Sequence, residues 1–314
     1  MRRKVILDVD TGTDDAIAIM LAALHSTIDL VSCTVVNGNA AVEYCTDNTL
    51  RVLDLIGRSD VPVYEGCARP LCRPDFPVPR DPTMPKALHG LTLPLPAAIS
   101  RKRPSGAVQF LVETFRESQE ELTLVSVGPL TNIAAAVVGD RNFAARVPEL
   151  VIMGGGREIG NVTVSAEFNF WADPEAASVV LSAGFPRITL VTLDATHRAL
   201  ITNDDCDVLE SLGTAAGRAS ATLIRHRIEV HDRVEPMAIP HSAPVHDALC
   251  VGFLIDGTLL ATRTAHVAVE TQGALTVGRS IIDTEGRTPA RCNCQVALDA
   301  DGRRFFALLR NTFA

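Results

Sequence analysis

The sequence predicts an α/β protein with a doubly wound, mostly parallel central sheet flanked by helices. Short β-branched runs alternate with helical segments, which is typical of a parallel sheet whose strands are joined by crossover helices. Of the 314 residues, 47% are hydrophobic and 21% are charged, the ordinary proportions of a globular chain with a large core. No internal repeat or low-complexity linker divides the chain, so we expect a single domain over residues 1–314.

The expected strands are the short apolar runs rich in Val, Ile and Leu. They are KVILDV (4–9), IDLVSCTVV (28–36), LTLVSV (122–127), ELVIMGGG (149–156, a strand running into a glycine loop) and RITLVTL (187–193). The helices expected between them show apolar residues at a spacing of three or four. They are 14–25, 41–57, 105–118, 129–139, 173–184 and the apolar segment that begins at 246. The second of these stops at Gly57, a usual end signal.

Two stretches break the alternation, and we expect them to be irregular loops near the active site. Residues 69–104 are crowded with prolines: Pro70, Pro74, Pro77, Pro79, Pro82, Pro85, Pro94, Pro96 and Pro104. Residues 225–246 hold four histidines and three prolines. Long irregular segments in a compact domain are usually functional loops or disorder. Ligands of open α/β sheets bind at the carboxyl ends of the strands, where such loops gather.

Charge and composition exclude several classes of partner. A net charge of −8 disfavours a nucleic-acid binder, which needs a basic face. No run approaches the roughly 20 apolar residues of a membrane span, and the apolar run of MRRKVILDVD is too short for a signal peptide. The eight cysteines show no paired metal-binding spacing, so we expect reduced thiols in a cytoplasmic protein and no zinc site.

The main chemical signal is ILDVDTGTDDAIAIMLAAL, which places Asp8, Asp10, Asp14 and Asp15 within eight residues between two apolar runs. Asp8 and Asp10 share one face of the strand end, whereas Asp14 and Asp15 fall in the first helical turn. A helix start stabilises one carboxylate and a turn accommodates another, but neither explains four. Hard cations such as Ca²⁺ and Mg²⁺ bind clustered carboxylate oxygens, so the stretch predicts a metal site.

Two further groups fit the same site. Asp247, which with His246 precedes an apolar helix, is either a cap or a metal ligand from a distant part of the chain. The segment GGGREIGNVTVSAEFNFWADPEA carries Asn161, Glu167 and Asn169, and Asn39 follows the second strand. Each Asn by itself is usually a turn residue. Together, amides and a carboxylate beside a cation suit the two adjacent hydroxyls of a sugar.

With these residues assembled, the chain resembles the inosine–uridine nucleoside hydrolases. The matching pieces, in family order, are DVDTGTDDAIA, VVNGN, VGPLTNIA, VIMGGG…GN…AEFNFWADPEA and HDAL. The resemblance implies a calcium-containing α/β enzyme that cleaves the N-glycosidic bond of ribonucleosides, in nucleoside salvage or catabolism. It also implies a homodimer or homotetramer.

The resemblance also implies roles for individual residues. Asp10, Asp15, Asp247 and the carbonyl of Val127 correspond to metal ligands, and Asp10 also to the general base. Asp14, Asn161, Glu167 and Asn169 correspond to ribose contacts, with Asn39 and Met153 as neighbours of the sugar. His246 corresponds to the acid for the leaving base, and His89 to a histidine on the base side. The implied reaction passes through an oxocarbenium-like sugar, as in other glycoside hydrolysis.

Two segments depart from the family pattern. HGLTLPLP lacks the usual residues after its His-Gly, and LIRHRIEVHDRVEP offers Arg225, His226 and His231 where members often place Tyr or His. The preferred base therefore stays open. So does the choice of acid among His246, His89 and a loop histidine within 226–241.

Two other functions compete with nucleoside hydrolysis. A haloacid dehalogenase-type phosphohydrolase also begins with a strand and D-x-D, but it needs Thr or Val where Gly12 stands, and no later strand ends in its acidic pair. A nucleoside-binding protein without turnover could use the same scaffold. Loss of Asp10 or His246 would favour it, and both are present, so the sequence favours hydrolysis.

Overall fold

The computed structural model describes residues 2–74 and 89–314. Its centre is a nine-stranded sheet in the order β10-β9-β11-β6-β5-β4-β1-β2-β3. The strands are β1 (Arg3–Val9), β2 (Ile28–Val35), β3 (Val63–Glu65), β4 (Leu122–Ser126), β5 (Glu149–Met153), β6 (Ile188–Val191), β9 (Leu260–Val269), β10 (Ser280–Asp283) and β11 (Cys294–Ala300). The pairings from β11 to β3 are parallel, whereas β9 and β10 add an antiparallel edge. A separate small sheet pairs β7 (Leu200–Thr202) with β8 (Ser242–Pro244).

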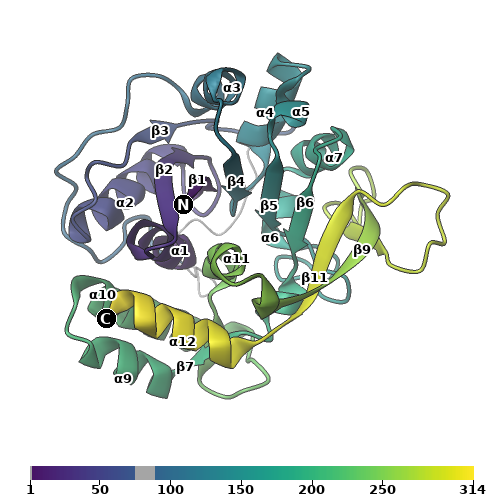
Figure 1. The fold of residues 1–314 in the computed structure, drawn as a ribbon. Helices are drawn as coiled ribbons and strands as arrows, with labels where there is room; N and C mark the ends of the chain where they lie inside the picture. Colours follow the sequence, from purple (N-terminus) through teal and green to yellow (C-terminus); the bar gives the residue numbers. More distant parts are fainter. Residues whose placement is uncertain (1, 75–88) are drawn as a thin grey trace.

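Helices cover both faces of the sheet (Figure 1). One face carries α1 (Thr13–Leu24), α2 (Val42–Leu55) and α11 (His246–Ile255), and an outer layer of α9 (Asn203–Ser211), α10 (Ala215–Val234) and α12 (Gly302–Phe313) packs on them. The other face carries α3 (Ala107–Glu117), α4 (Thr131–Gly139), α5 (Phe143–Arg146) and α7 (Pro174–Ser182). Short helices α6 (Phe168–Ala172), α8 (Leu193–Thr196) and η1 (Gly257–Leu259) lie in the connections.

The alternation of side chains along the strands builds the two core layers. In β1, Val5 and Leu7 pack into the layer with α1 and α11, whereas Ile6 packs into the layer with α3 and α4. All three are fully buried, because successive strand residues point to opposite faces and helices cover both. This explains why the central strands read as continuous apolar runs in the sequence. The doubly wound prediction is confirmed.

The topology fixes where a ligand can bind. From β1 the chain winds outward through β2 and β3, and it then returns to the other side of β1 to build β4, β5 and β6. The connections after β1 and β4 therefore diverge, leaving the crevice at their carboxyl ends in which open α/β sheets bind ligands. Asp10 follows the end of β1 and Val127 follows the end of β4, so both lie at this edge.

The irregular loop predicted over 225–246 is wrong for residues 225–234, which belong to α10, and for residues 242–244, which form β8. Helix α10 continues to Val234, with Ile224, Ile228 and His231 buried on the face that packs inward. The histidines and the later prolines had suggested an irregular chain, but the apolar spacing of three or four continues until just before Pro236.

The proline-rich stretch forms no helix or strand in its described parts, 69–74 and 89–104. The part of this predicted loop that holds Pro77, Pro79, Pro82 and Pro85 lies outside the described residues.

Helix α2 ends at Leu55, and Gly57 adopts a left-handed φ of 71°, the geometry that makes glycine a helix stop. Within residues 2–74 and 89–314, no helix is both long enough and apolar enough to cross a membrane.

Candidate active site

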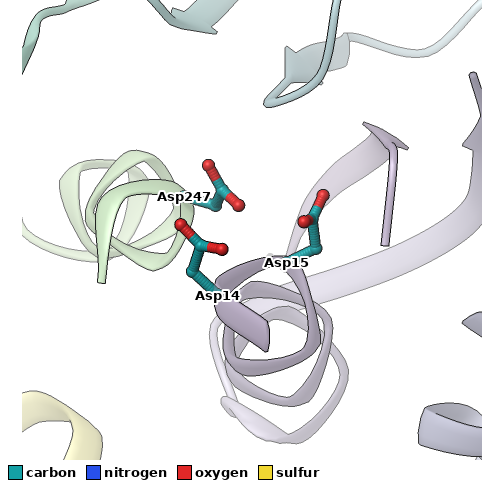
Figure 2. A group of neighbouring side chains, drawn as sticks. All are labelled: Asp14, Asp15 and Asp247. Carbon is teal, nitrogen blue, oxygen red and sulfur yellow. The ribbon is translucent and has the colours of Figure 1, made fainter. Parts of the chain in front are cut away.

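Three carboxylates from two distant parts of the chain meet at the start of two neighbouring helices. Asp14 and Asp15 open α1, and Asp247 opens α11, which packs beside α1 (Figures 1 and 2). One oxygen from each carboxylate lies within 4.8 Å of the others. The three side chains are buried, and both helix N-termini direct backbone N–H groups without intrahelical partners toward this edge of the sheet.

Asp10 lies beside this group, where the loops after β1 and β2 interlock. Its Oδ2 accepts a hydrogen bond from the backbone N–H of Asn39 at 2.7 Å, and its own N–H donates to Asp15 Oδ1 at 3.1 Å. The Asn39 side-chain amide donates to Asp15 Oδ2 at 3.2 Å. Gly38 permits this approach, because a Cβ there would lie 2.0 Å from Asp10 Oδ2. The predicted grouping of Asp10, Asp15 and Asn39 is therefore present.

The raised pKa values of the clustered carboxyl groups indicate a site that a cation would stabilise. Burial and the neighbouring charge of Asp15 hold the pKa of Asp10 well above its usual range. Burial and Asp14 raise the pKa of Asp15 to about 6, and burial with the same neighbour raises that of Asp247 well above normal. Carboxylates this close are stable as anions only when a positive charge compensates them. A cluster of oxygen donors only fits Ca²⁺ or Mg²⁺ better than a softer metal.

One positive charge already reaches the cluster, and the sequence analysis missed it. Arg227 of α10 is 1% exposed, and its Nη1 donates to Asp14 Oδ1 at 2.9 Å and to Thr13 Oγ1 at 3.1 Å. Its Nε donates to the carbonyl of Pro244 at 3.0 Å. The spacing with Ile224 and Ile228 places Arg227 on the buried face of α10, a signal that the expectation of a loop concealed.

Asp8 is not part of the cluster, although it lies on β1 only two residues before Asp10. It accepts hydrogen bonds from Thr34 Oγ1 at 2.5 Å, Asn132 Nδ2 at 2.8 Å and Ser126 Oγ at 3.3 Å. Complete burial raises its pKa to about 6. Asp8 thus connects β1 to β2, β4 and α4 beneath the site, which is a structural role.

Asn169 joins the ends of β4 and β5. Its Nδ2 donates to the Val127 carbonyl at 2.8 Å and to the Met153 carbonyl at 3.2 Å, and it lies 3.5 Å from Met153 Sδ. The structure therefore brings these three predicted site residues together. A carbonyl oxygen has two lone pairs, so Val127 can accept from Asn169 and still face a cation.

The two remaining predicted sugar contacts are engaged with backbone. Glu167 caps α6: Oε1 accepts from Asn169 N at 2.8 Å, and Oε2 from Gly155 N at 2.8 Å and Phe170 N at 3.1 Å. Burial raises the pKa of Glu167 to about 7. Asn161 is exposed, and its Oδ1 accepts from Phe168 N at 2.9 Å. Both side chains thus order the loop before α6.

Three of the candidate acid histidines are buried or half-buried beside the cluster. His246 Nδ1 lies 2.7 Å from Thr196 Oγ1, and burial together with Arg227 holds its pKa well below the usual range. His89 Nδ1 accepts from Thr13 N at 2.9 Å, and burial lowers its pKa to about 4. Burial likewise lowers the pKa of His231 to about 4.

The other two loop candidates, His226 and His241, are exposed. One histidine that the sequence analysis did not single out also lies here. His197 stacks at a tilt against His246, with ring centroids 5.8 Å apart.

Comparison with known proteins gives consistent matches over the whole chain. The profile of the family described as inosine-uridine preferring nucleoside hydrolase matches residues 5–307. The pyrimidine-specific ribonucleoside hydrolase RihA of Photobacterium profundum is 35% identical over 314 residues, covering 100% of this chain and 99% of that protein.

Solved structures give the same result. The plant nucleoside hydrolase PpNRh1 superposes with a TM-score of 0.90 at 29% identity, covering 100% of this chain and 99% of that one. The purine-preferring ribonucleoside hydrolase from Gardnerella vaginalis superposes with a TM-score of 0.89 at 29% identity, covering 99% and 98%.

Proposed function

The chain belongs to the inosine-uridine preferring nucleoside hydrolase family, and we propose that its acidic cluster is the site where it hydrolyses the N-glycosidic bond of ribonucleosides to ribose and free base. The observation that carries this assignment is the convergence of Asp14, Asp15 and Asp247 at the carboxyl edge of the sheet, with Asp10 beside them. Neither a phosphohydrolase nor a binding protein accounts better for the family match over residues 5–307.

The cluster is suited to hold a calcium ion through Asp10, Asp15, Asp247 and the carbonyl of Val127. The raised pKa values of the three carboxyl groups support this, because a divalent cation would compensate charges that burial otherwise makes costly. When bound, such a cation supplies a strong local field that lowers the pKa of an adjacent water molecule.

Asp10 is the proposed general base. The Asn39 N–H fixes its Oδ2, so the carboxylate is held in one orientation at the end of β1. As the bond to the base breaks, positive charge develops on the sugar ring, and the surrounding carboxylates stabilise it. Asp14, Asn39 and Asn169 are the proposed contacts of the ribose hydroxyls, with Glu167, Asn161 and Met153 shaping the wall around them.

His246 is the proposed acid for the leaving base. Its contact with Thr196 Oγ1 at 2.7 Å engages Nδ1, which leaves Nε2 for the base. His89 and His231 remain the alternatives, since both lie near Arg227 at the same edge of the cluster. A proton donor of this kind typically contributes about 10²–10⁴-fold to the rate.

Pyrimidine ribonucleosides are the proposed first substrates, because the curated relatives at 35% identity are named as pyrimidine-specific. The solved neighbours include a purine-preferring enzyme, so the base must be chosen by residues outside the acidic cluster. A homodimer or homotetramer follows from the family resemblance, and a cytoplasmic location is expected from the cysteines without paired spacing. Both remain predictions.

The test is release of reducing sugar from uridine, cytidine, inosine, adenosine and guanosine. We expect ribose release with calcium present and its near abolition in Asp10→Ala, which removes the base and a metal ligand together. Asp204→Ala, an exposed aspartate in the first turn of α9, is the matched control and should behave as the unmodified protein. Activity of Asp10→Ala within tenfold of the unmodified protein, or full activity in protein shown to be metal-free, would overturn the assignment. Nucleoside binding without ribose release would favour the binding protein.

A further inference from the structure

The ion pair between Arg227 and Asp14 differs from the others in the described chain. The side chains of Arg227 and Asp14 are 1% and 7% exposed. In the pair of Arg73 and Glu175 the side chains are 27% and 26% exposed. Every other ion pair among residues 2–74 and 89–314 has at least one side chain that is more than 30% exposed. A guanidinium is withdrawn from water only where its hydrogen bonds are well placed. The proposed mechanism leaves Arg227 without a role.

Two segments hold the guanidinium in place. Nε donates to the carbonyl of Pro244 at 3.0 Å, two residues before α11. Nη1 donates to Thr13 Oγ1 at 3.1 Å and to Asp14 Oδ1 at 2.9 Å at the start of α1. Arg227 thus connects α10 to the beginnings of both helices that carry the acidic cluster, and it fixes one oxygen of Asp14.

This contact distinguishes Asp14 from its neighbours. Asp15 accepts its hydrogen bonds from backbone N–H groups and the Asn39 amide, and no cationic side chain in the described chain donates to Asp15 or Asp247. A cation bound to Asp14 would lie close to the guanidinium and be repelled by it. A neutral hydroxyl on the same carboxylate would meet no such repulsion.

We propose that Arg227 is a positioning residue that assigns Asp14 to the sugar rather than to the metal. By holding Oδ1, it leaves Oδ2 as the acceptor for a ribose hydroxyl, while the cation is left to Asp10, Asp15 and Asp247. The inference rests on the proposed function, in which Asp14 contacts the ribose, and it adds the role of Arg227 in orienting that carboxylate.

The experiment separates metal binding from sugar recognition in Arg227→Gln, Arg227→Lys, Asp14→Asn and the double variant Arg227→Gln/Asp14→Asn. Calorimetric titration of metal-free protein gives the Ca²⁺ affinity, and kinetics on uridine and 2′-deoxyuridine give the preference for ribose. Arg218→Gln, which removes an exposed charge from the same helix, is the matched control.

We expect Arg227→Gln to bind Ca²⁺ as tightly as the unmodified protein or more tightly. Its KM for uridine should rise at least about tenfold, the equivalent of about 1.4 kcal/mol, and its ribose preference should fall. Arg227→Lys keeps the positive charge but loses the planar guanidinium that donates from two nitrogens, so it should keep part of the preference for ribose over deoxyribose. The double variant should lose no more than Asp14→Asn, because residues that act as a unit are not additive.

A tenfold weaker Ca²⁺ affinity in Arg227→Gln with an unchanged ribose preference would overturn the proposal, because Arg227 would then support the metal site rather than the contact of Asp14 with the sugar. An equal loss in Arg218→Gln would also overturn it, as an effect of net charge. If Arg227→Gln does not fold, Ca²⁺ affinity and ribose preference are compared in Arg227→Lys and in the double variant, which removes both buried charges. If the unmodified protein releases no ribose, the proposed function fails separately, and the Ca²⁺ titration still shows whether Arg227 supports the metal.

Discussion

Calcium should bind this protein more weakly as the pH falls from 7 to 5. Burial and the charge of Asp14 raise the pKa of Asp15 to about 6 in the metal-free fold, against 3.8 for an ordinary aspartate. The folded protein therefore keeps this proton where the unfolded chain has lost it. Ionising the buried Asp15 lowers the free energy of unfolding of the metal-free protein. This loss is absent below about pH 4 and fully present above about pH 6. Below pH 6, a cation must displace the proton to bind.

A single carboxyl group with a pKa of about 6 is mostly protonated at pH 5 and mostly ionised at pH 7. Competition with this one proton makes Ca²⁺ binding about tenfold weaker at pH 5 than at pH 7, or about 1.4 kcal/mol. The pKa values of Asp10 and Asp247 are also raised, so the measured dependence should be at least this steep.

Calorimetric titration of Ca²⁺ into metal-free protein at pH 5, 6 and 7 measures the effect. Asp204→Asn, an exposed aspartate that opens α9, is the control and should keep the full dependence. A dissociation constant that stays the same across this range, or that falls toward pH 5, would refute the assignment of the buried cluster as the calcium site.

Three other predictions follow from the site. His246→Ala should lower kcat on uridine at least about 10²-fold but keep most activity on p-nitrophenyl riboside, whose leaving group needs no proton. If steady-state kinetics show equal losses on both substrates, His246 instead shapes the metal site beside Asp247. Nucleosides should be cleaved with far higher kcat/KM than their 5′-monophosphates, because a phosphate would meet Asp14 and Glu167 without a phosphate-binding loop; equal values for uridine and its monophosphate would contradict this. Asp8→Ala should lower the free energy of unfolding in urea by at least about 1–3 kcal/mol, since it leaves buried donors such as Asn132 unsatisfied, and an unchanged unfolding midpoint would contradict its structural role.

Local sequence patterns determined the framework of this protein. The strands from 4–9 to 187–193 and the helices between them were predictable because burial on both faces demands apolar, β-branched runs, and helical packing demands a spacing of three or four. The strands β9, β10 and β11 were not predicted because they lack such a run; β9, for example, has four exposed residues among its ten. The acidic start of α1 was equally readable, since both of its helical aspartates lie in one turn.

The tertiary structure alone decided which of these groups meet and what each one faces. Asp247 joins Asp14 and Asp15 from more than two hundred residues away, because α1 and α11 pack side by side at the switch point of the sheet. Arg227 reaches Asp14 across a similar separation, so no local pattern could reveal that one of the acidic residues already has a cationic partner. Periodicity reports which face of an element is buried. The partners on that face, and hence the charge and hydrogen bonding of the site, depend on how distant elements pack.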